Sequence, residues 1–394
     1  MSVLDHNGDH CSAIVQAVWT RVVLLCCALL GASLVLAQGN TARPLVIRVL
    51  LSTQSKATIT VATAHTAIYS DGTVFTQSDS ALEWRLSITA SGKIGVETAQ
   101  GVYDTGRQML TMQTAQDGYF QFAGRIYRGS SAVIAQGGTL QVLNTLDLED
   151  YVRGVLPREM PSGWPDEALK AQAVIARTYA VSKLNPNATY DLCASEQCQV
   201  YEGASAETPR GNGASEATRG EILSWQGRAA QTFFHADSGG YTASSAEIWG
   251  GQIQYLQARA DPGSRTSPTP WRINVSNATI QNAVNRFAPK AGAYKSMSIT
   301  SRTASGRPGA IIINGAVSIT GVSVYAFARA IGAKSSMIGL ASSNPLVIVG
   351  YGNGHGVGLS QYGARWFAQS GYAYKQILSY YYSGVSIGQY EVAP

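Results

Sequence analysis

Alternating hydrophobic and polar positions dominate the first third of the chain. Turn-forming residues such as Asp71-Gly72 separate four segments that alternate or run apolar: Leu45–Leu51, Ala57–Thr63, Leu82–Ala90 and Gly118–Gly129. A period of two is typical of β-strands that bury one face. We therefore expect a β-rich portion over residues 44–146, without helices, whose default role is binding or spacing.

The pattern changes near Asp147. In Pro165–Ser182, apolar residues from Leu169 to Ala180 recur at spacings of four and three, which predicts a helix with an alanine-rich face. Pro165 suits a first helical position, and acidic residues follow it in the first turn. Further helices are expected at 276–288, 323–331 and 374–382 and just after Leu359, and strands at 220–228, 296–303 and 309–315. The mixture predicts the α+β class, with a mixed α+β catalytic portion over residues 147–394.

An apolar run of 15 residues, Val22–Leu36, follows Arg21. It is short for a membrane span, which needs about 20 residues. It suits the apolar region of a signal peptide cleaved after Ala37, although the segment before it is long and carries Asp5 and Asp9. Residues 1–37 are therefore expected to be a signal peptide or an uncleaved N-terminal anchor, and the protein to be secreted or extracytoplasmic.

Composition narrows the function classes. Charged residues make up 13% of the chain, about half of the usual share of roughly 25%. This argues against a disordered chain and against a coiled coil. The net charge is +5 without a basic cluster, which argues against a nucleic-acid-binding protein.

Few residues could hold a metal ion. Removal of residues 1–37 would leave Cys193 and Cys198, and the histidines His65, His235 and His355. An even number of cysteines in an oxidising compartment favours a disulfide. A free pair and a metal pair remain alternatives, and the metal pair would need two further ligands.

Glu159 is the first candidate for chemistry. It lies in Leu156–Trp164, between Pro157 and Pro161, which restrict the backbone on both sides. A carboxyl on such a rigid turn, next to Met160 and the Trp164 ring, would be partly desolvated, and desolvation raises its pKa. That makes it a candidate general acid. The alternative is a surface glutamate at a helix entry, and Asp237 and Glu247 are candidates for a second acid.

Two histidine segments are the next candidates. His235 is followed by Ser238, Gly239 and Gly240, and the glycines permit a tight turn or a close approach to a ligand. His355 lies in a glycine-rich stretch that lacks the lysine of a phosphate-binding loop. That stretch suits the backbone wall of a groove for an extended ligand, or a hairpin with a buried structural histidine. Tyrosines and tryptophans are numerous, and their faces can stack on sugar rings or pack in a core.

Four long segments resemble a known family. Leu148–Val181, Tyr190–Gly203, Phe233–Gly251 and Gly354–Val385 are similar to the motifs of the stage II sporulation protein D/LytB family, in family order. The resemblance extends from about Arg48 to Val385. It implies a peptidoglycan lytic transglycosylase that cleaves the β-1,4 bond between N-acetylmuramic acid and N-acetylglucosamine, without a cofactor, and leaves a 1,6-anhydro end. Glu159 matches the glutamate of the LPxEM motif, the family's catalytic acid/base.

The resemblance also implies a set of groove-lining residues. They occupy family motif positions and would bind substrate: Arg177, Gln199, Tyr201, His235, Ser238, Gly239, Gly240, Trp249, His355, Gln361 and Tyr362. Gln197 stands where family members often have a histidine before the second cysteine, which weakens the metal alternative and favours the Cys193–Cys198 disulfide. No metal is expected.

The family name leaves more than one function open. The first hypothesis is the glycan-cleaving enzyme. The second is a non-catalytic glycan-binding enhancer of a cell-wall amidase, and the third is a structural wall-binding protein that uses the β-rich portion alone. The expected partner is the peptidoglycan glycan strand, with an amidase as a further candidate. No nucleic acid is expected, and a membrane only through the N-terminal segment if it stays uncleaved.

Overall fold

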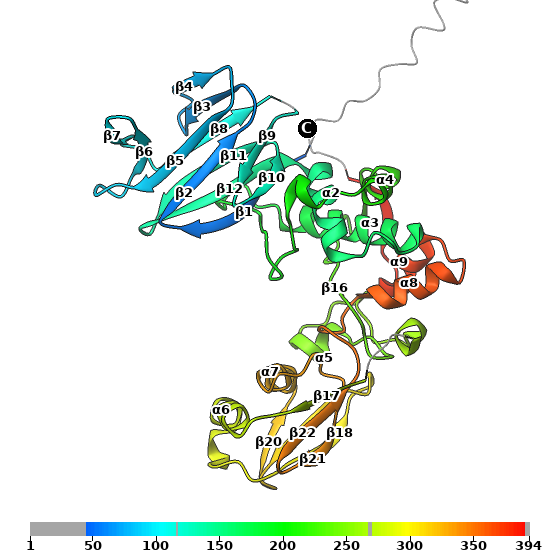
Figure 1. The fold of residues 1–394 in the computed structure, drawn as a ribbon. Coiled ribbons are helices and arrows are strands. Elements are labelled where there is room, and N and C mark those ends of the chain that lie inside the picture. Colours follow the sequence, from blue (N-terminus) through cyan, green and yellow to red (C-terminus); the bar gives the residue numbers. More distant parts are fainter. Residues whose placement is uncertain (1–44, 116, 267–269, 391–394) are drawn as a thin grey trace, which may run out of the picture. The chain divides into compact units, whose positions relative to one another are not determined.

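The computed structural model describes residues 45–390 except 116 and 267–269 (Figure 1). The predicted signal segment over residues 1–37 lies outside these residues. Strands fill the first hundred described residues and helices follow, which confirms the α+β class. Within the described residues, no helix is both long and apolar enough to cross a membrane.

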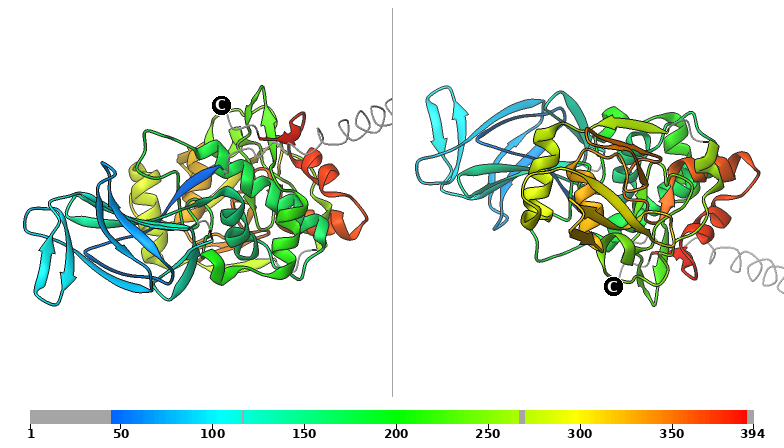
Figure 2. Two further views of the ribbon diagram at one scale, coloured as in Figure 1. Left: turned by 90° about the horizontal axis from the view of Figure 1, so that it is seen from above. Right: turned by 90° about the horizontal axis from the view of Figure 1, so that it is seen from below.

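Two sheets form the β-rich portion, and they lie next to each other in both views of Figure 2. Their strands pair antiparallel except at one edge, where β13 (Leu192–Cys193), from later in the chain, pairs parallel with β1 (Val46–Gln54). In the described chain the larger sheet has the order β13-β1-β12-β11-β8-β3-β4, with bounds β1 Val46–Gln54, β3 His65–Tyr69, β4 Val74–Ser78, β8 Met109–Thr114, β11 Ser130–Gln136, β12 Thr139–Asp147 and β13 Leu192–Cys193. The other has the order β10-β9-β2-β5-β6-β7, with bounds β2 Lys56–Val61, β5 Leu82–Ile88, β6 Ile94–Thr98, β7 Gly101–Asp104, β9 Tyr119–Phe122 and β10 Arg125–Arg128.

The predicted alternation is visible in β2. Ala57, Ile59 and Val61 are buried, while Lys56 and Thr58 are exposed. The sheets meet at a buried polar contact, where the Trp84 indole donates to His65 Nε2 at 2.9 Å. His65 is therefore a satisfied core histidine.

A helical layer begins directly after β12. Helix α2 (Leu148–Glu159) starts at the cap residue Asp147, whose side chain accepts from the Glu149 N–H at 2.7 Å. Helix α3 (Asp166–Lys183) matches the predicted Pro165–Ser182 helix within one residue. It is buried almost all round rather than on one face, because it packs against α2, α4, α8 and α9. Figure 1 shows α3 among these helices.

Helix α2 corrects the expectation that Glu159 sits on a turn. Glu159 is the last residue of the helix, and Pro157 lies inside the final turn. A proline there removes a helical hydrogen bond. The buried side chains of Tyr151, Val152 and Leu156 hold α2 against its neighbours nonetheless.

The remaining elements include the helices expected at 276–288, 323–331 and 374–382, with ends within two residues of the predicted ones. Their bounds are α4 Pro209–Ala217, β14 Glu221–Trp225, β15 Arg228–Ala229, β16 Phe234–His235, α5 Ser245–Trp249, β17 Trp271–Asn274, α6 Asn277–Phe287, β18 Met297–Arg302, β19 Pro308–Ile313, β20 Val317–Thr320, α7 Val322–Ala330, β21 Ile338–Ser343, β22 Leu346–Gly350, β23 Leu359–Ser360, α8 Gln361–Gln369, α9 Tyr374–Tyr381 and β24 Ser386–Gln389, with 3-10 turns at Gly203–Ala206, Pro262–Thr266 and Pro289–Ala291.

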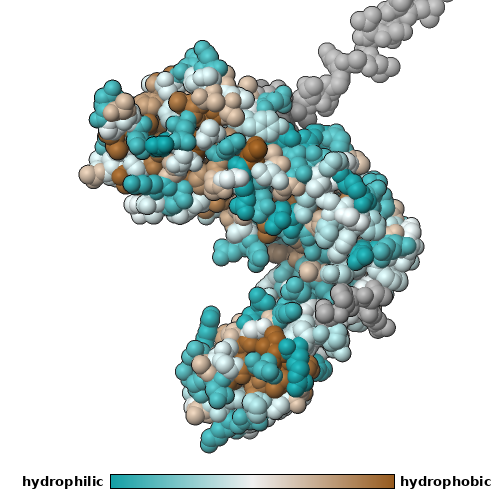
Figure 3. Space-filling view, viewed as in Figure 1, coloured by the Kyte–Doolittle hydropathy of each residue, from teal (hydrophilic) through white to brown (hydrophobic). Residues whose placement is uncertain are grey.

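Buried hydrophobic side chains of the described residues form two clusters. The first joins strands of the β-rich portion, such as Ile47, to helices as late as α9, where Leu378 is buried. The second runs from Trp271 to Ile348 and includes α6, α7 and the small sheets around them. Teal and white residues predominate on the face drawn in Figure 3, with smaller brown areas between them.

Candidate active site

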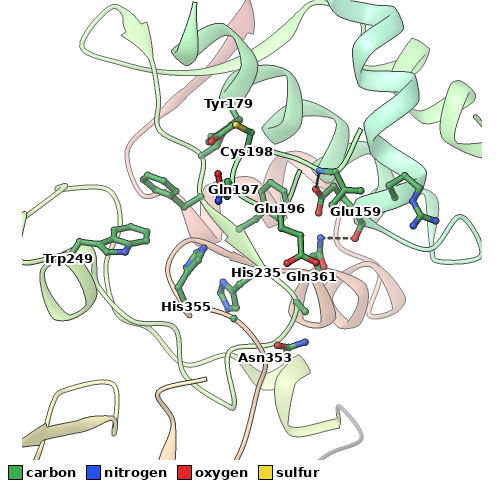
Figure 4. Close-up of a pocket in the computed structure, with 17 residues that line it drawn as sticks. Glu159, Tyr179, Glu196, Gln197, Cys198, His235, Trp249, Asn353, His355 and Gln361 are labelled. Atoms are coloured by element: carbon green, nitrogen blue, oxygen red, sulfur yellow. Dashed lines mark hydrogen bonds between the residues drawn. The ribbon is translucent and has the colours of Figure 1, made fainter. Parts of the chain in front are cut away.

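A pocket of about 570 Å³ lies where several distant segments of the chain meet (Figure 4). The C-terminus of α2, the Cys193–Cys198 loop, strand β16, helix α5, the loop before β23 and the start of α8 all contribute. Its walls are Arg158, Glu159, Tyr179, Glu196, Gln197, Cys198, Val200, Thr232, Phe233, Phe234, His235, Ala236, Trp249, Asn353, Gly354, His355 and Gln361. Five of the predicted site residues are in this set: Glu159, His235, Trp249, His355 and Gln361.

Two hydrogen bonds from other segments fix Glu159 in the pocket wall. The Val200 N–H donates to Glu159 Oε1 at 2.7 Å. The Gln361 side-chain amide, at the start of α8, donates to the Glu159 carbonyl at 2.9 Å and to Gln172 Oε1 at 3.3 Å. The carboxyl and its backbone are therefore held from two sides.

The surroundings of Glu159 favour its protonated form. Burial raises the pKa of its carboxyl, the Val200 N–H opposes this rise, and the negative charge of Glu196 adds to it. No salt bridge to Glu159 occurs among the described residues. A carboxyl that keeps its proton to higher pH than usual and opens into a pocket can act as a general acid.

The sequence-based reason for this desolvation is only partly met. Met160 is fully buried, as expected. The Trp164 ring instead packs edge-on against Tyr362 at 5.1 Å and is not part of the pocket wall. The aromatic side chains of the wall are Phe233, Phe234 and Trp249, together with Tyr179.

Two neutral histidines line the side of the pocket formed by β16 and the loop before β23. The ring centres of His235 and His355 lie 5.4 Å apart. Burial lowers the pKa of His235 well below its usual value and that of His355 to about 4. Both rings are therefore uncharged near neutral pH.

The backbone of Val357 sets the tautomers of both rings. His235 Nδ1 donates to the Val357 carbonyl at 3.1 Å, and His355 Nδ1 accepts from the Val357 N–H at 3.0 Å. With its proton on Nδ1, His235 presents an acceptor lone pair at Nε2. This atom is buried and has no hydrogen-bond partner among the described residues.

Trp249 offers an aromatic face at the rim. It ends helix α5, next to Gly250, whose φ of 79° closes the helix in the left-handed conformation. Its side chain is 40% exposed, and its ring packs 4.5 Å from Phe233 and 5.2 Å from His355. A supported but exposed indole is a platform on which an apolar sugar face can stack.

The Cys193–Cys198 loop closes the pocket opposite the histidines. The two cysteines form a disulfide in the structure. Glu196 and Gln197, between them, are exposed and belong to the pocket wall. The sequence analysis missed Glu196, although an acid in the middle of a short disulfide-closed loop is a signal that could have pointed to it.

The two acids that the sequence offers as partners of Glu159 lie outside the pocket wall. Asp237 is buried and accepts from the Gly239 N–H at 3.0 Å. Glu247 accepts from the Ser305 N–H at 3.2 Å. Neither carboxylate is part of the pocket wall.

Three predicted groove residues lie in the interior instead. Arg177 is fully buried and forms a bidentate ion pair with Glu149, at 2.7 and 2.8 Å. Gln199 Oε1 accepts from the Tyr151 hydroxyl at 3.1 Å. The Tyr201 hydroxyl donates to Asn144 Oδ1 at 2.6 Å. The polar atoms of Arg177 and Tyr201 are satisfied by the protein, whereas Gln199 Nε2 is buried without a hydrogen-bond partner among the described residues. All three side chains lie behind the pocket wall and not in it.

The other predicted residues outside the wall shape the turn after His235. Ser238 donates to Asp261 Oδ2 at 2.6 Å. Gly239 and Gly240 have φ values of 79° and 107°, which other residues rarely adopt. Tyr362 packs on Trp164, and its N–H donates to the Ala236 carbonyl at 3.0 Å. The parallel pairing of β16 with β23 then brings His235 opposite Ser360, beside Gln361.

Known proteins share these segments. A family model described as "Stage II sporulation protein" matches residues 136–225. An uncharacterised protein of Brachyspira hyodysenteriae is 35% identical over 316 residues, which cover 79% of this chain and 84% of that protein. The chain belongs to the stage II sporulation protein D/LytB family.

Two Bacillus subtilis relatives carry functional names. The protein named amidase enhancer is 30% identical over 289 residues, covering 61% of this chain and 40% of the relative. Stage II sporulation protein D is 29% identical over 272 residues, covering 63% of this chain and 76% of the relative. The match to the stage II sporulation protein model includes Glu159 and the disulfide loop, while His235, Trp249 and His355 lie beyond it.

The side chains around the pocket are not arranged like the ligands of a metal centre. Among the described residues, no group of three or more His, Cys, Asp and Glu side chains is arranged to hold a metal ion. The thiolates that a metal would need are joined in the disulfide.

Proposed function

We propose that this family member is an exported cell-wall enzyme that cleaves glycan strands of peptidoglycan. Its bond would be the β-1,4 linkage between N-acetylmuramic acid and N-acetylglucosamine, and its product a 1,6-anhydro sugar end. The family membership supports a cell-wall role, and the predicted signal segment supports export. The observation that carries the proposal is the Glu159 carboxyl, which faces the pocket, has a raised pKa and forms no salt bridge with any of the described residues.

A single carboxyl suffices for this reaction. The protonated Glu159 donates its proton to the glycosidic oxygen, and the C1–O bond breaks with its electron pair on the leaving oxygen. The resulting carboxylate then takes the proton of the C6 hydroxyl as that oxygen bonds to C1. Glu159 ends the cycle protonated, and no water is consumed. Hydrolases instead require a second carboxylate that activates water or attacks C1.

The rest of the pocket suits a sugar polymer with an uncharged backbone. His235 Nε2 supplies a buried acceptor for a hydroxyl, and Trp249 supplies a stacking face. Both histidines are neutral near neutral pH, so neither demands a charged ligand. Gln197, Asn353 and Gln361 add uncharged polar groups to the wall.

A second function is supported by one of the relatives. The Bacillus subtilis protein named amidase enhancer matches residues of this chain at 30% identity. In that case the pocket would bind the glycan without cutting it and present it to a cell-wall amidase. The retained Glu159 environment favours the enzyme, because binding alone does not require a carboxyl with a raised pKa.

Digestion of peptide-free glycan strands tests the proposal. We expect anhydro-muramyl ends, detected by mass spectrometry, with the wild-type protein and a loss of about 10³- to 10⁴-fold in kcat for Glu159→Gln. Glu83→Gln, at an exposed position of β5, is the matched control and should retain activity. An equal rate for Glu159→Gln would overturn the mechanism, and no product with the wild-type protein would favour the amidase enhancer.

A further inference from the structure

A second acid reaches the pocket from the disulfide-closed loop. Glu196 lies between Cys193 and Cys198, and its side chain is in the same pocket as Glu159, Gln361 and His235 in Figure 4. The cysteines are five positions apart in the sequence, and their Cα atoms are 5.5 Å apart. The loop is thus too short and too constrained to carry Glu196 far from the wall.

Glu196 differs from the other glutamates of the same segment. Glu202 forms ion pairs with Arg125 at 2.8 Å and with Arg158 at 3.1 Å. Glu207 pairs with Arg128 at 2.6 Å. No cation pairs with Glu196 among the described residues, and its carboxylate is exposed to the pocket. Its charge is therefore available to a ligand.

We propose that Glu196 is the second carboxylate of this site, facing the scissile linkage from the disulfide loop while Glu159 faces it from the end of α2. The inference rests on the proposed glycan cleavage and adds a catalytic residue to it. Glu196 acts through its negative charge and forms no covalent bond.

The chemistry gives such a carboxylate a role. When Glu159 protonates the glycosidic oxygen and the C1–O bond breaks, positive charge develops on C1 and the ring oxygen. A negative charge placed next to C1 in the pocket stabilises the positive charge that develops there. The charge disappears when the C6 oxygen bonds to C1 and its proton passes to Glu159. Glu196 thus acts only while the charge exists, so it should affect kcat more than binding.

Glu196 also acts on Glu159 itself. Its negative charge raises the pKa of the Glu159 carboxyl, whereas Arg158 lowers it. The other titratable side chains around Glu159 carry no charge near neutral pH: Tyr151 and Tyr179, whose pKa values are raised, and His235 and His355, whose pKa values are lowered. Loss of the Glu196 charge should therefore move the alkaline limb of the activity profile to lower pH, because Glu159 must be protonated to start the reaction.

The experiment compares Glu196→Gln with the wild-type protein on peptide-free glycan strands. We expect kcat to fall by about 100-fold, the affinity for a glycan oligomer to change by less than about threefold, and the alkaline limb to move to lower pH. Glu196→Asp, which keeps the charge, should recover part of the activity. Ser195→Ala, in the same loop but outside the pocket wall, is the matched control and should behave as wild type.

The outcomes separate this inference from the proposed function. If the wild-type protein forms no anhydro product, the proposed cleavage fails and Glu196 has no reaction to assist. If the wild-type protein forms it and Glu196→Gln keeps both its kcat and its alkaline limb, cleavage stands and the second carboxylate is refuted. A loss in affinity alone, with kcat unchanged, would also refute it.

Discussion

The two ends of helix α2 carry glutamates with opposite fates. At the first turn, Glu149 is buried and accepts from Arg177 at 2.7 and 2.8 Å and from the Gly220 N–H at 3.0 Å. At the last residue, the Glu159 carboxyl accepts from a single N–H and has no cation partner among the described residues. The same helix therefore holds one acid as a structural element and presents the other to a pocket.

The difference shows what separates a structural acid from a reactive one in this fold. Arg177 comes from α3 and uses its remaining N–H groups on the carbonyls of Ser215 and Glu221, so both members of the buried pair are satisfied. Glu159 has burial without a compensating charge, and this raises its pKa. The family motif does not distinguish Glu149 from Glu159, because both lie within the same motif segment, Leu148–Val181.

The largest expected effect on stability comes from breaking the Glu149–Arg177 ion pair at the first turn of α2. Glu149→Gln leaves the Arg177 guanidinium buried without its counter-charge, which should lower the free energy of unfolding by about 3–5 kcal/mol. Urea unfolding followed by far-UV circular dichroism measures this loss. Glu216→Gln, which breaks exposed ion pairs with Arg219 and Arg153, is the control and should cost about 1 kcal/mol or less. A wild-type midpoint for Glu149→Gln would show that the buried pair is not what holds α2 to α3.

A smaller loss of stability is expected when the Cys193–Cys198 loop, next to Glu159, is opened. The double variant Cys193→Ser/Cys198→Ser removes a short cross-link, which should lower the free energy of unfolding by about 2 kcal/mol. Opening the loop also loosens Val200, whose N–H holds the Glu159 carboxyl, and frees Glu196. We therefore expect kcat on glycan strands to fall by up to about 100-fold.

Reductant provides the matched measurement for the loop. Wild-type protein treated with reductant should approach the double variant in activity, while the double variant itself should not respond. Full activity of the double variant, at a temperature where it stays folded, would show that the disulfide contributes to stability and not to the site.

Local patterns predicted the parts of this molecule that local physics determines. The strand β2, with its alternating burial, and the helix α3, with its alanines, follow directly from residue spacing. Helix α2 was not predicted from the sequence, because Pro157 near its end is a local signal against a helix. The tertiary packing of residues such as Leu156 outweighs that signal in the folded protein.

The site was harder to predict because its walls come from distant segments. Glu159 and His235 were candidates from their own surroundings in the sequence, and the family resemblance supplied their expected roles. Arg177 was assigned to the groove because it occupies a family motif position, and no local signal shows that Glu149, 28 residues away, neutralises it. Glu196 was missed for the converse reason, since only the folded loop places it beside Glu159. The neighbours of each site residue come from distant segments, so no single stretch of sequence contains them.

The smallest expected effect is the change with pH in the contribution of Glu159, at the C-terminal end of α2, to the free energy of unfolding. The folded-state pKa of Glu159 is raised above its ordinary value of 4.5, so the folded state binds this proton more tightly than the unfolded state. The resulting stability is fully present below about pH 4.5 and is lost as the pH rises through the folded-state pKa. Glu159→Gln cannot ionise and escapes this loss. Its free energy of unfolding, relative to wild type, should therefore be higher at about pH 8 than at about pH 4. The acid titration of His235 and His355 is common to both proteins and cancels in the comparison. A difference that stays constant between the two pH values would show that Glu159 ionises as easily in the folded protein as in the unfolded chain, and that burial at this end of α2 does not store the proton.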